Sequence, residues 1–212
     1  MNIGLFFGSF DPIHLGHVFI AKHKQIAQKT DQVWFVITPQ SPFKNGKISA
    51  SFSHREKMAI MALSDHPDLY VSNIAINMPS PQYPANTLKY LKVKHPTYRF
   101  SIIMGFDNFV SLVDMKWKDS NYILNNFKIF VYNRHIEDET ISFSNYIIKS
   151  YKKFKPNITA LSGTRLPTSS TSVRLYLNQK YPTSSINSPS LFIKKNLDIR
   201  VLNYILKNKL YY

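Results

Sequence analysis

The sequence has 212 residues, 44% of them hydrophobic, and it contains no cysteine. This composition is typical of a globular chain with a sizeable core, and it excludes disulfides, thiolate nucleophiles and cysteine-based zinc sites. The 27 basic and 12 acidic side chains give a formal net charge of +15, which indicates anionic partners but does not distinguish a nucleotide from a nucleic acid.

Hydrophobic patterns and turn residues predict strands that alternate with helices. The strands are expected at residues 3–7, 33–38, 69–76, 99–104 and 128–132, and the helices at residues 15–29, from 53 onward, 85–94, 121–126, 168–178 and 198–207. The second helix is expected to begin with a capping box, in which Ser53 is the N-cap and Glu56 is its partner. Strands that alternate with helices predict an α/β fold with a parallel sheet, which binds its ligand at the carboxyl ends of the strands.

Three further segments carry weaker signals. Residues 135–156 are compatible with an exposed helix, and the Ser/Thr/Pro-rich residues 182–189 predict a loop. The first residues have neither the basic region nor the cleavage site of a secretory signal, and no apolar run reaches the roughly 20 residues of a membrane-spanning helix. We therefore expect a cytoplasmic protein without membrane association.

The segment Gly8–His17, which reads GSFDPIHLGH, lies between the first strand and the first helix. A turn that begins with glycine and leads into a helix exposes backbone amides that bind phosphate. His14 and His17 are three residues apart, so both side chains can point toward one pocket, and Gly16 is expected to leave room for a ligand. Three alternatives remain, namely a metal half-site, two surface histidines without a role, and a Ser9 nucleophile that lacks the Gly-x-Ser-x-Gly motif.

Residues 168–174, which read TSSTSVR, form a second candidate anion site. Hydroxyl groups and free amides at a helix start, with Arg174 one turn further on, can bind phosphate oxygens, although an ordinary Ser/Thr N-cap is the alternative. Three more residues have two interpretations each. Lys44 is either a phosphate contact or a solvated lysine, Asp107 is either functional or a helix cap, and Trp117 either stacks on a ligand or packs in the core.

These two segments resemble the signatures of the nucleotidyltransferase superfamily that carries a His-x-Gly-His motif. The second segment resembles the Ser-Ser-Thr-x-x-Arg motif of the adenylyltransferase branch, and the Arg-Thr-x-Gly-x-Ser-Thr pattern of cytidylyltransferases is absent. The resemblance implies a Rossmann-like, doubly wound, mainly parallel sheet with a small helical C-terminal region. It also implies transfer of a nucleotidyl group from a nucleoside triphosphate.

Four further segments are similar to the bacterial nicotinate-nucleotide adenylyltransferases. They are residues 41–44 (SPFK), residues 83–88 (YPANTL), residues 105–108 (GFDN) with Trp117, and residues 204–211, which resemble the family's C-terminal Tyr-Ile-x-x-x-x-Leu-Tyr. Three residues depart from the family pattern: Gln82 replaces a serine, Pro84 a threonine and Phe106 a glycine. Pro84 offers neither a hydroxyl nor an amide hydrogen, so the preference for an acid or an amide acceptor stays open.

The resemblance implies transfer of AMP from ATP to nicotinic acid mononucleotide, which gives deamido-NAD and pyrophosphate in NAD biosynthesis. The attacking phosphate is already ionised, so no general base is needed. Mg²⁺ is the implied cofactor and enters with ATP, without a metal site on the protein. The implied catalytic residues are His14 and His17; the implied ATP and phosphate contacts are Gly8, Ser9, Phe10, Lys44, Gly105, Asp107, Ser170, Thr171 and Arg174; and the implied mononucleotide contacts are Tyr83, Thr87 and Trp117.

Two alternative functions stay open. The first keeps the chemistry but uses nicotinamide mononucleotide or phosphopantetheine as acceptor, and the second is a basic nucleic-acid-binding module on a degenerate nucleotidyltransferase fold. On the main interpretation the partners are ATP and a pyridine mononucleotide, with no nucleic acid and no membrane, and the oligomeric state stays open. We expect a nucleotide-binding core at residues 1–165 and a helical region at residues 166–212, which together form one compact domain.

Overall fold

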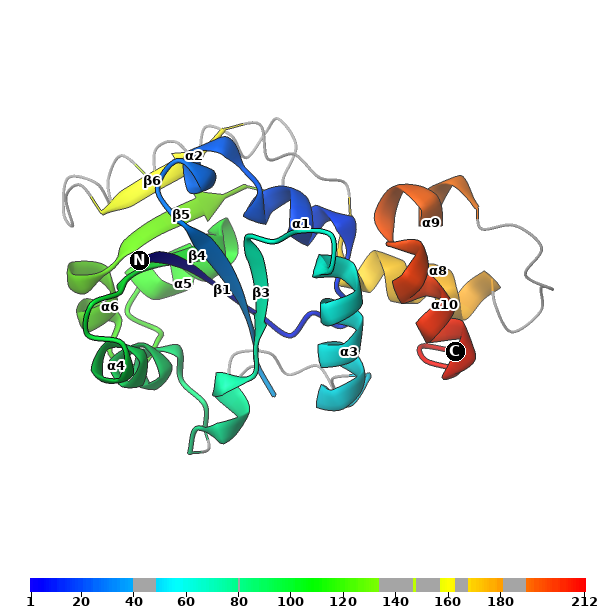
Figure 1. Ribbon diagram of the computed structural model, residues 1–212, viewed down its shortest axis with the longest axis horizontal. Coiled ribbons are helices and arrows are strands. Elements are labelled where there is room, and N and C mark those ends of the chain that lie inside the picture. Colours follow the sequence, from blue (N-terminus) through cyan, green and yellow to red (C-terminus); the bar gives the residue numbers. More distant parts are fainter. Residues whose placement is uncertain (40–48, 80, 134–146, 148–156, 163–167, 181–189) are drawn as a thin grey trace.

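A computed structural model describes residues 1–39, 49–79, 81–133, 147, 157–162, 168–180 and 190–212. Six parallel strands form one sheet in the order β3-β2-β1-β4-β5-β6 (Figure 1). The strands are β1 (Asn2–Gly8), β2 (Gln32–Ile37), β3 (Leu69–Ser72), β4 (Arg99–Gly105), β5 (Lys128–Tyr132) and β6 (Ile158–Leu161). This order, in which the chain starts at the centre and winds outward in both directions, confirms the predicted doubly wound fold.

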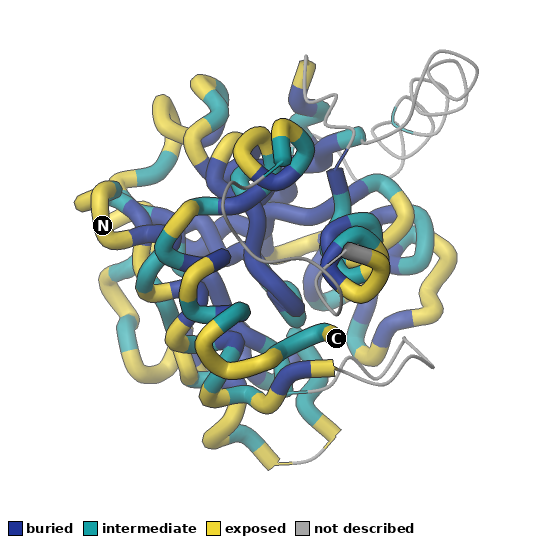
Figure 2. Tube along the Cα trace, turned by 90° about the vertical axis from the view of Figure 1, so that its right-hand side faces the viewer, coloured by how far each residue is buried: buried dark blue, intermediate teal, exposed yellow. Residues whose placement is uncertain are grey.

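The helices cover both faces of the sheet. On one face lie α1 (Leu15–Ala21), α2 (Lys24–Ala27) and α3 (Phe52–Leu63), and on the other lie α4 (Pro84–Lys94), α5 (Phe106–Val113) and α6 (Ser120–Asn126). Side chains along β1 alternate between these faces, because Ile3 and Leu5 pack in one apolar cluster and Phe6 in the other. Figure 2 shows the resulting continuous buried interior around the strands.

Three C-terminal helices gather beside α3 (Figure 1). They are α8 (Ser170–Lys180), α9 (Leu191–Asn196) and α10 (Ile199–Lys207). The guanidinium of Arg200 on α10 donates to the carboxylate of Asp65 at 2.8 Å, and the Tyr204 hydroxyl lies 2.8 Å from Nδ1 of His54 on α3. Buried residues of all three helices belong to the same apolar cluster as α1 and α3. We propose on this ground that the core and the C-terminal region form one compact domain.

Several predicted elements differ from the observed ones. The helix expected at residues 15–29 is two helices, because His23 adopts an extended conformation (ψ 134°) and its Nδ1 caps α2 by accepting from Gln25 N–H. The strand expected at residues 69–76 ends at Ser72 and is followed by a 3₁₀ helix, η1 (Ile74–Asn77). Helices α5 and α9 and strand β6 were not expected. The segments 135–156 and 182–189 lie outside the described residues, apart from residue 147.

The predicted capping box at Ser53 is wrong. Helix α3 begins at Phe52, and its N-cap is Ser51, whose hydroxyl accepts from His54 N–H at 3.4 Å. Arg55, in the first turn of this helix, lies on its buried face. There its Nε donates to the carbonyl of Ala50, the residue that precedes the cap, at 3.1 Å. This side-chain bond and the burial of the arginine favour the earlier start over the predicted one.

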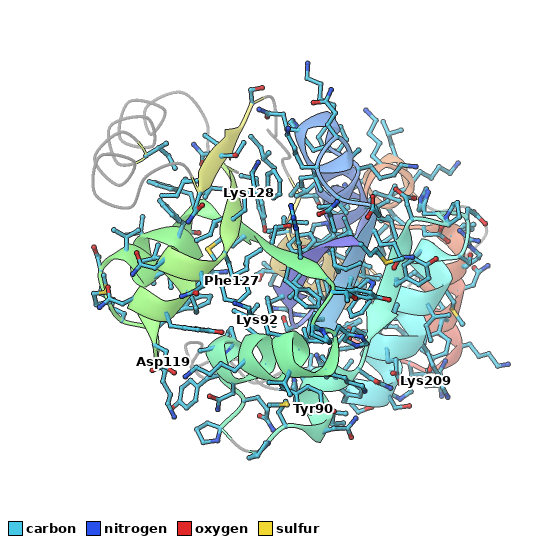
Figure 3. All side chains as sticks on the ribbon, turned by 60° about the vertical axis from the view of Figure 1, so that its left-hand side comes forward. Tyr90, Lys92, Asp119, Phe127, Lys128 and Lys209 are labelled. Atoms are coloured by element: carbon cyan, nitrogen blue, oxygen red, sulfur yellow. The ribbon has the colours of Figure 1, made fainter. Side chains whose placement is uncertain are left out.

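Part of the positive charge lies at the amino ends of the strands. Figure 3 shows Lys92 and Lys128 on either side of Phe127, and Lys92 Nζ lies 5.4 Å from the centre of that ring. Burial, and then the neighbouring Lys29, lower the pKa of Lys128. These lysines therefore lie at the edge of the sheet opposite to the carboxyl ends of the strands. No helix in the described ranges is long and apolar enough to cross a membrane.

Candidate functional site

The carboxyl ends of β1 and β4 form the switch point of the sheet. The two strands are neighbours, with Phe6 opposite Ile103, and they end at Gly8 and Gly105. From Gly8 the chain leads to α1 on one face, and from Gly105 it leads to α5 on the other. A crevice at such a point is the usual ligand site of this fold class. The structure thus brings the two predicted glycine turns to one edge of the sheet.

His14 and His17 form a stacked pair at the start of α1. Their ring centroids are 3.7 Å apart with an interplanar angle of 26°, and the residues are 4% and 6% exposed. The backbone N–H of His14 donates to Nδ1 of His17 at 3.2 Å. Because Nδ1 accepts this bond, the neutral imidazole of His17 carries its proton on Nε2. The two rings thus lie together, and their predicted orientation toward one ligand pocket stays a prediction.

The ring of Phe10 packs against the histidine pair through His17. Its ring is buried and meets the ring of His17 edge-on, at a centroid distance of 5.0 Å, and it also packs on Phe6 and Phe35. The side chain therefore belongs to the core, although Phe10 was predicted as an ATP contact. Its backbone has a φ of 48°, a conformation uncommon for a bulky residue. Any contact between Phe10 and ATP would thus come from its backbone, and this role stays a prediction.

Gly16 is tightly packed in the direction in which a side chain would project, although the residue also lines the cavity described below. A Cβ atom at this position would lie 2.8 Å from the Cγ2 methyl of Thr168 and 2.9 Å from Nδ1 of His14. Both distances are shorter than a Cβ atom tolerates, so Thr168 and His14 occupy the space that a side chain at residue 16 would need. Glycine is needed here because it lets the His14 ring and the 168–174 segment pack against the first turn of α1.

We expect Gly16→Ala to lower the free energy of unfolding by about 1 to 2 kcal/mol, although alanine has the higher helix propensity, because overpacking costs about 1 to 3 kcal/mol. The methyl must displace His14 or Thr168. Urea unfolding of the variant, of Thr168→Ser and of the double variant measures the effect. Thr168→Ser removes the nearest methyl and should restore part of the lost stability. A Gly16→Ala protein as stable as the wild type would contradict the packing described.

Side chains from two helices hold the loop that leads to the histidines. The Ser9 carbonyl accepts from Arg55 on α3 at 2.6 Å. Further along the loop, the guanidinium of Arg174 donates to the Asp11 carbonyl at 2.6 Å, and the Ser170 hydroxyl donates to the Pro12 carbonyl at 2.9 Å; both side chains belong to α8. These bonds fix the loop backbone on both sides of Asp11, so the histidine pair stands on a rigid support.

Arg55 is a residue of this site that the sequence reasoning missed. It is 1% exposed, and its guanidinium donates to four carbonyl oxygens, those of Ser9, Thr38, Pro39 and Ala50. Burial lowers the pKa of Arg55, and the nearby Asp11 opposes this effect. A signal for it was present in the sequence, because an arginine stands at helical spacing from Met58, Ala59 and Ala62 on the apolar face of α3.

The second predicted anion site lies beside the first one. Arg174 reaches Asp11 and, at 3.3 Å, the Thr171 hydroxyl, bonds that use two of its five N–H groups and leave capacity for a phosphate. Gly105 is the N-cap of α5, and Asp107 is exposed in the first turn, where a carboxylate is favourable beside the positive end of the helix dipole. Lys44 lies outside the described residues. The phosphate-binding roles of these residues stay predictions.

Two of the predicted mononucleotide contacts, Tyr83 and Thr87, lie at the start of α4. Tyr83 is the N-cap of this helix, and Lys118 Nζ lies 5.1 Å from the centre of its ring. Pro84 occupies the first helical position, where its missing amide hydrogen costs nothing. Thr87 is buried, and Trp117 is 9% exposed within the apolar cluster below α4 and α5. This burial favours packing for Trp117, and its stacking on a ligand stays a prediction.

A cavity of about 700 Å³ opens beside the histidine pair, between α1 and α9. It is lined mainly by apolar groups, and its lining residues include Leu15, Gly16, Phe19, Thr168 and Phe192. A cavity of this volume is large enough for a nucleoside-sized ligand. Gly16, which lies between His14 and His17 in the sequence, is among the lining residues, whereas the two histidines are not.

Comparison with known proteins identifies the family. The family model for cytidylyltransferase-like proteins matches residues 5–175. A probable nicotinate-nucleotide adenylyltransferase of Flavobacterium psychrophilum is 45% identical over 134 residues, which cover 63% of this chain and 68% of the relative. One of Cytophaga hutchinsonii is 33% identical over 180 residues, which cover 85% of this chain and 88% of the relative.

Solved structures support the same fold. Plasmodium falciparum nicotinic acid mononucleotide adenylyltransferase complexed with NaAD superposes with a TM-score of 0.70 at 21% identity, over 99% of this chain and 97% of that one. The same enzyme complexed with APC gives a TM-score of 0.69 at 22% identity, over 99% and 96% of the two chains. The chain therefore belongs to the cytidylyltransferase-like family and, within it, to the nicotinate-nucleotide adenylyltransferases.

Proposed function

We propose that the protein transfers the adenylyl group of ATP to the phosphate of nicotinic acid mononucleotide, which forms deamido-NAD and pyrophosphate. The names of its relatives agree with this reaction. The observation that carries the proposal is the stacked His14–His17 pair on a loop held by Arg55, Arg174 and Ser170. The site offers fixed hydrogen-bond donors, and this reaction needs donors because its attacking group is an ionised phosphate.

The reaction requires two anions to approach each other in line. An oxygen of the mononucleotide phosphate bonds to the α-phosphorus of ATP, and the bond from that phosphorus to the oxygen bridging to the β-phosphate breaks to release pyrophosphate. The Nε2–H group of His17 can donate a hydrogen bond to a phosphate oxygen that gains negative charge in this step. Arg174, with unused N–H groups, and the hydroxyls of Ser170 and Thr171 suit the pyrophosphate side. The largely apolar cavity beside Gly16 suits the adenosine part.

We propose that Mg²⁺ enters with the triphosphate. Among the described residues, no group of three or more His, Asp or Glu side chains lies close enough together to hold a metal ion. The Asp11 carboxylate already accepts bonds from Ser49, Ala50 and Tyr211. The residues present therefore fit a metal ion that is bound mainly by phosphate oxygens and water. When bound, such an ion neutralises phosphate charge.

The acceptor is tested by comparing three substrates with ATP and Mg²⁺: nicotinic acid mononucleotide, nicotinamide mononucleotide and phosphopantetheine. We expect kcat/KM to be highest for the acid, with equal amounts of pyrophosphate and deamido-NAD formed. A higher value for either other acceptor would reassign the substrate while keeping the chemistry. Salt-sensitive binding of DNA or RNA without pyrophosphate release would instead support the nucleic-acid alternative.

A further inference from the structure

Tyr211 makes a contact with the active-site loop from the far end of the sequence. Its hydroxyl donates to Oδ1 of Asp11 at 2.8 Å, across 200 residues of chain. The backbone of Tyr211 has a φ of 73°, a conformation that costs energy for a bulky residue and persists only where other contacts impose it. The segment after α10 is thus bent so that this side chain reaches the loop.

The bond from Tyr211 completes the coordination of a buried carboxylate. Asp11 is 3% exposed, and its two oxygens also accept from the backbone N–H groups of Ser49, at 2.7 Å, and Ala50, at 3.1 Å. Burial, and then the adjacent Asp11, raise the pKa of Tyr211. The phenol therefore stays protonated and remains a donor throughout the physiological pH range.

The main chain and the side chain of Asp11 are held by different groups. Arg174 binds its main-chain carbonyl, whereas Tyr211, Ser49 and Ala50 bind its side chain. Asp11 stands three residues before His14, which is the N-cap of α1 and the stacking partner of His17. A rotation of the Asp11 side chain or backbone would therefore shift the start of α1 and the two imidazoles.

We propose that Tyr211 is a positioning residue for adenylyl transfer. Through Asp11 it sets the orientation of the loop that presents His14 and His17 to the phosphates, and this role rests on the function proposed above. Catalysis by fixed donors depends on their placement to within about 0.5 Å. Loss of the hydroxyl should therefore slow the chemical step more than it weakens substrate binding or the fold.

The test compares Tyr211→Phe with Tyr212→Phe. Each variant loses one hydroxyl, but the Tyr212 hydroxyl donates to the Leu206 carbonyl on the surface, at 3.1 Å. We expect Tyr211→Phe to lower kcat about tenfold, with KM for ATP changed less than threefold, because bonds to charged groups are among the stronger ones in proteins. Tyr212→Phe should keep kcat within twofold of the wild type. A Tyr211→Phe enzyme with wild-type kcat, or equal losses in both variants, would overturn the proposal.

Hydrogen exchange of the ligand-free protein separates this proposal from the proposed function. In Tyr211→Phe, but not in Tyr212→Phe, the amides of residues 11, 13–17 and 49–50 should exchange faster, since their shared anchor is weakened. If the wild type releases no pyrophosphate with any of the three acceptors, the proposed function fails, and the exchange data alone decide the role of Tyr211. Unchanged exchange in these amides would then overturn it.

Discussion

His17→Asn should lower kcat by about 10² to 10³, because removal of one preorganised donor from a charge-stabilising site typically costs that much. Asparagine is chosen because its Oδ1 takes the place of Nδ1. It can therefore still accept the hydrogen bond from the backbone N–H of His14, the N-cap residue of α1. It lacks any group at the position of Nε2, where His17 carries its proton. The variant therefore tests the donor while it keeps the cap.

Rates of pyrophosphate release at saturating ATP and nicotinic acid mononucleotide measure this effect, with thermal unfolding as a check on the fold. His66→Asn is the matched control, because His66 follows the C-terminal end of α3 and its imidazole lies 3.2 Å from Nζ of the surface residue Lys22. We expect its kcat to stay within twofold of the wild type. Wild-type turnover by His17→Asn would remove His17 from the mechanism.

The parts of the fold that depend on local pattern were predictable. Short apolar runs predicted β1, β2, β4 and β5, because a strand that is buried on both faces consists almost entirely of apolar residues. Strand β3 was expected to be longer than it is, since the apolar residues of η1 continue the run beyond Ser72. Strand β6 has four residues with the pattern buried-intermediate-intermediate-buried, which is too short and irregular for a sequence signal.

The candidate site was predictable where one segment holds its parts. His14 and His17 share one helix turn, so their spacing alone placed them together. The contacts that support this turn were not predictable, because they come from distant segments: Arg55 from α3, Arg174 from α8 and Tyr211 from beyond α10. Only the fold brings these residues to the loop of residues 9–12. The bonds of the two arginines end on main-chain carbonyls, which every residue has, so the accepting positions show no sequence pattern.

Arg55→Met should lower the free energy of unfolding by about 3 to 5 kcal/mol, the range found when one member of a buried charged network is removed. Methionine fills a similar volume, so the loss comes from polar groups and not from a cavity. Four carbonyl oxygens lose their donor, and Asp11 loses the nearby positive charge. Arg55→Lys should recover only part of the lost stability, since an ammonium group cannot reproduce the planar guanidinium that reaches all four oxygens.

Urea unfolding measures the loss, and Arg99→Met serves as the control. Arg99 is an exposed arginine at the start of β4, where such a change should stay within about 0.5 kcal/mol. A free energy of unfolding for Arg55→Met within about 1 kcal/mol of the wild-type value would contradict the network, because an average point mutation already costs that much. Arg55 joins the carbonyls of Ser9, after β1, to those of Thr38 and Pro39, after β2. Because one guanidinium ties the ends of both strands together, any folded fraction of Arg55→Met should also show a reduced kcat.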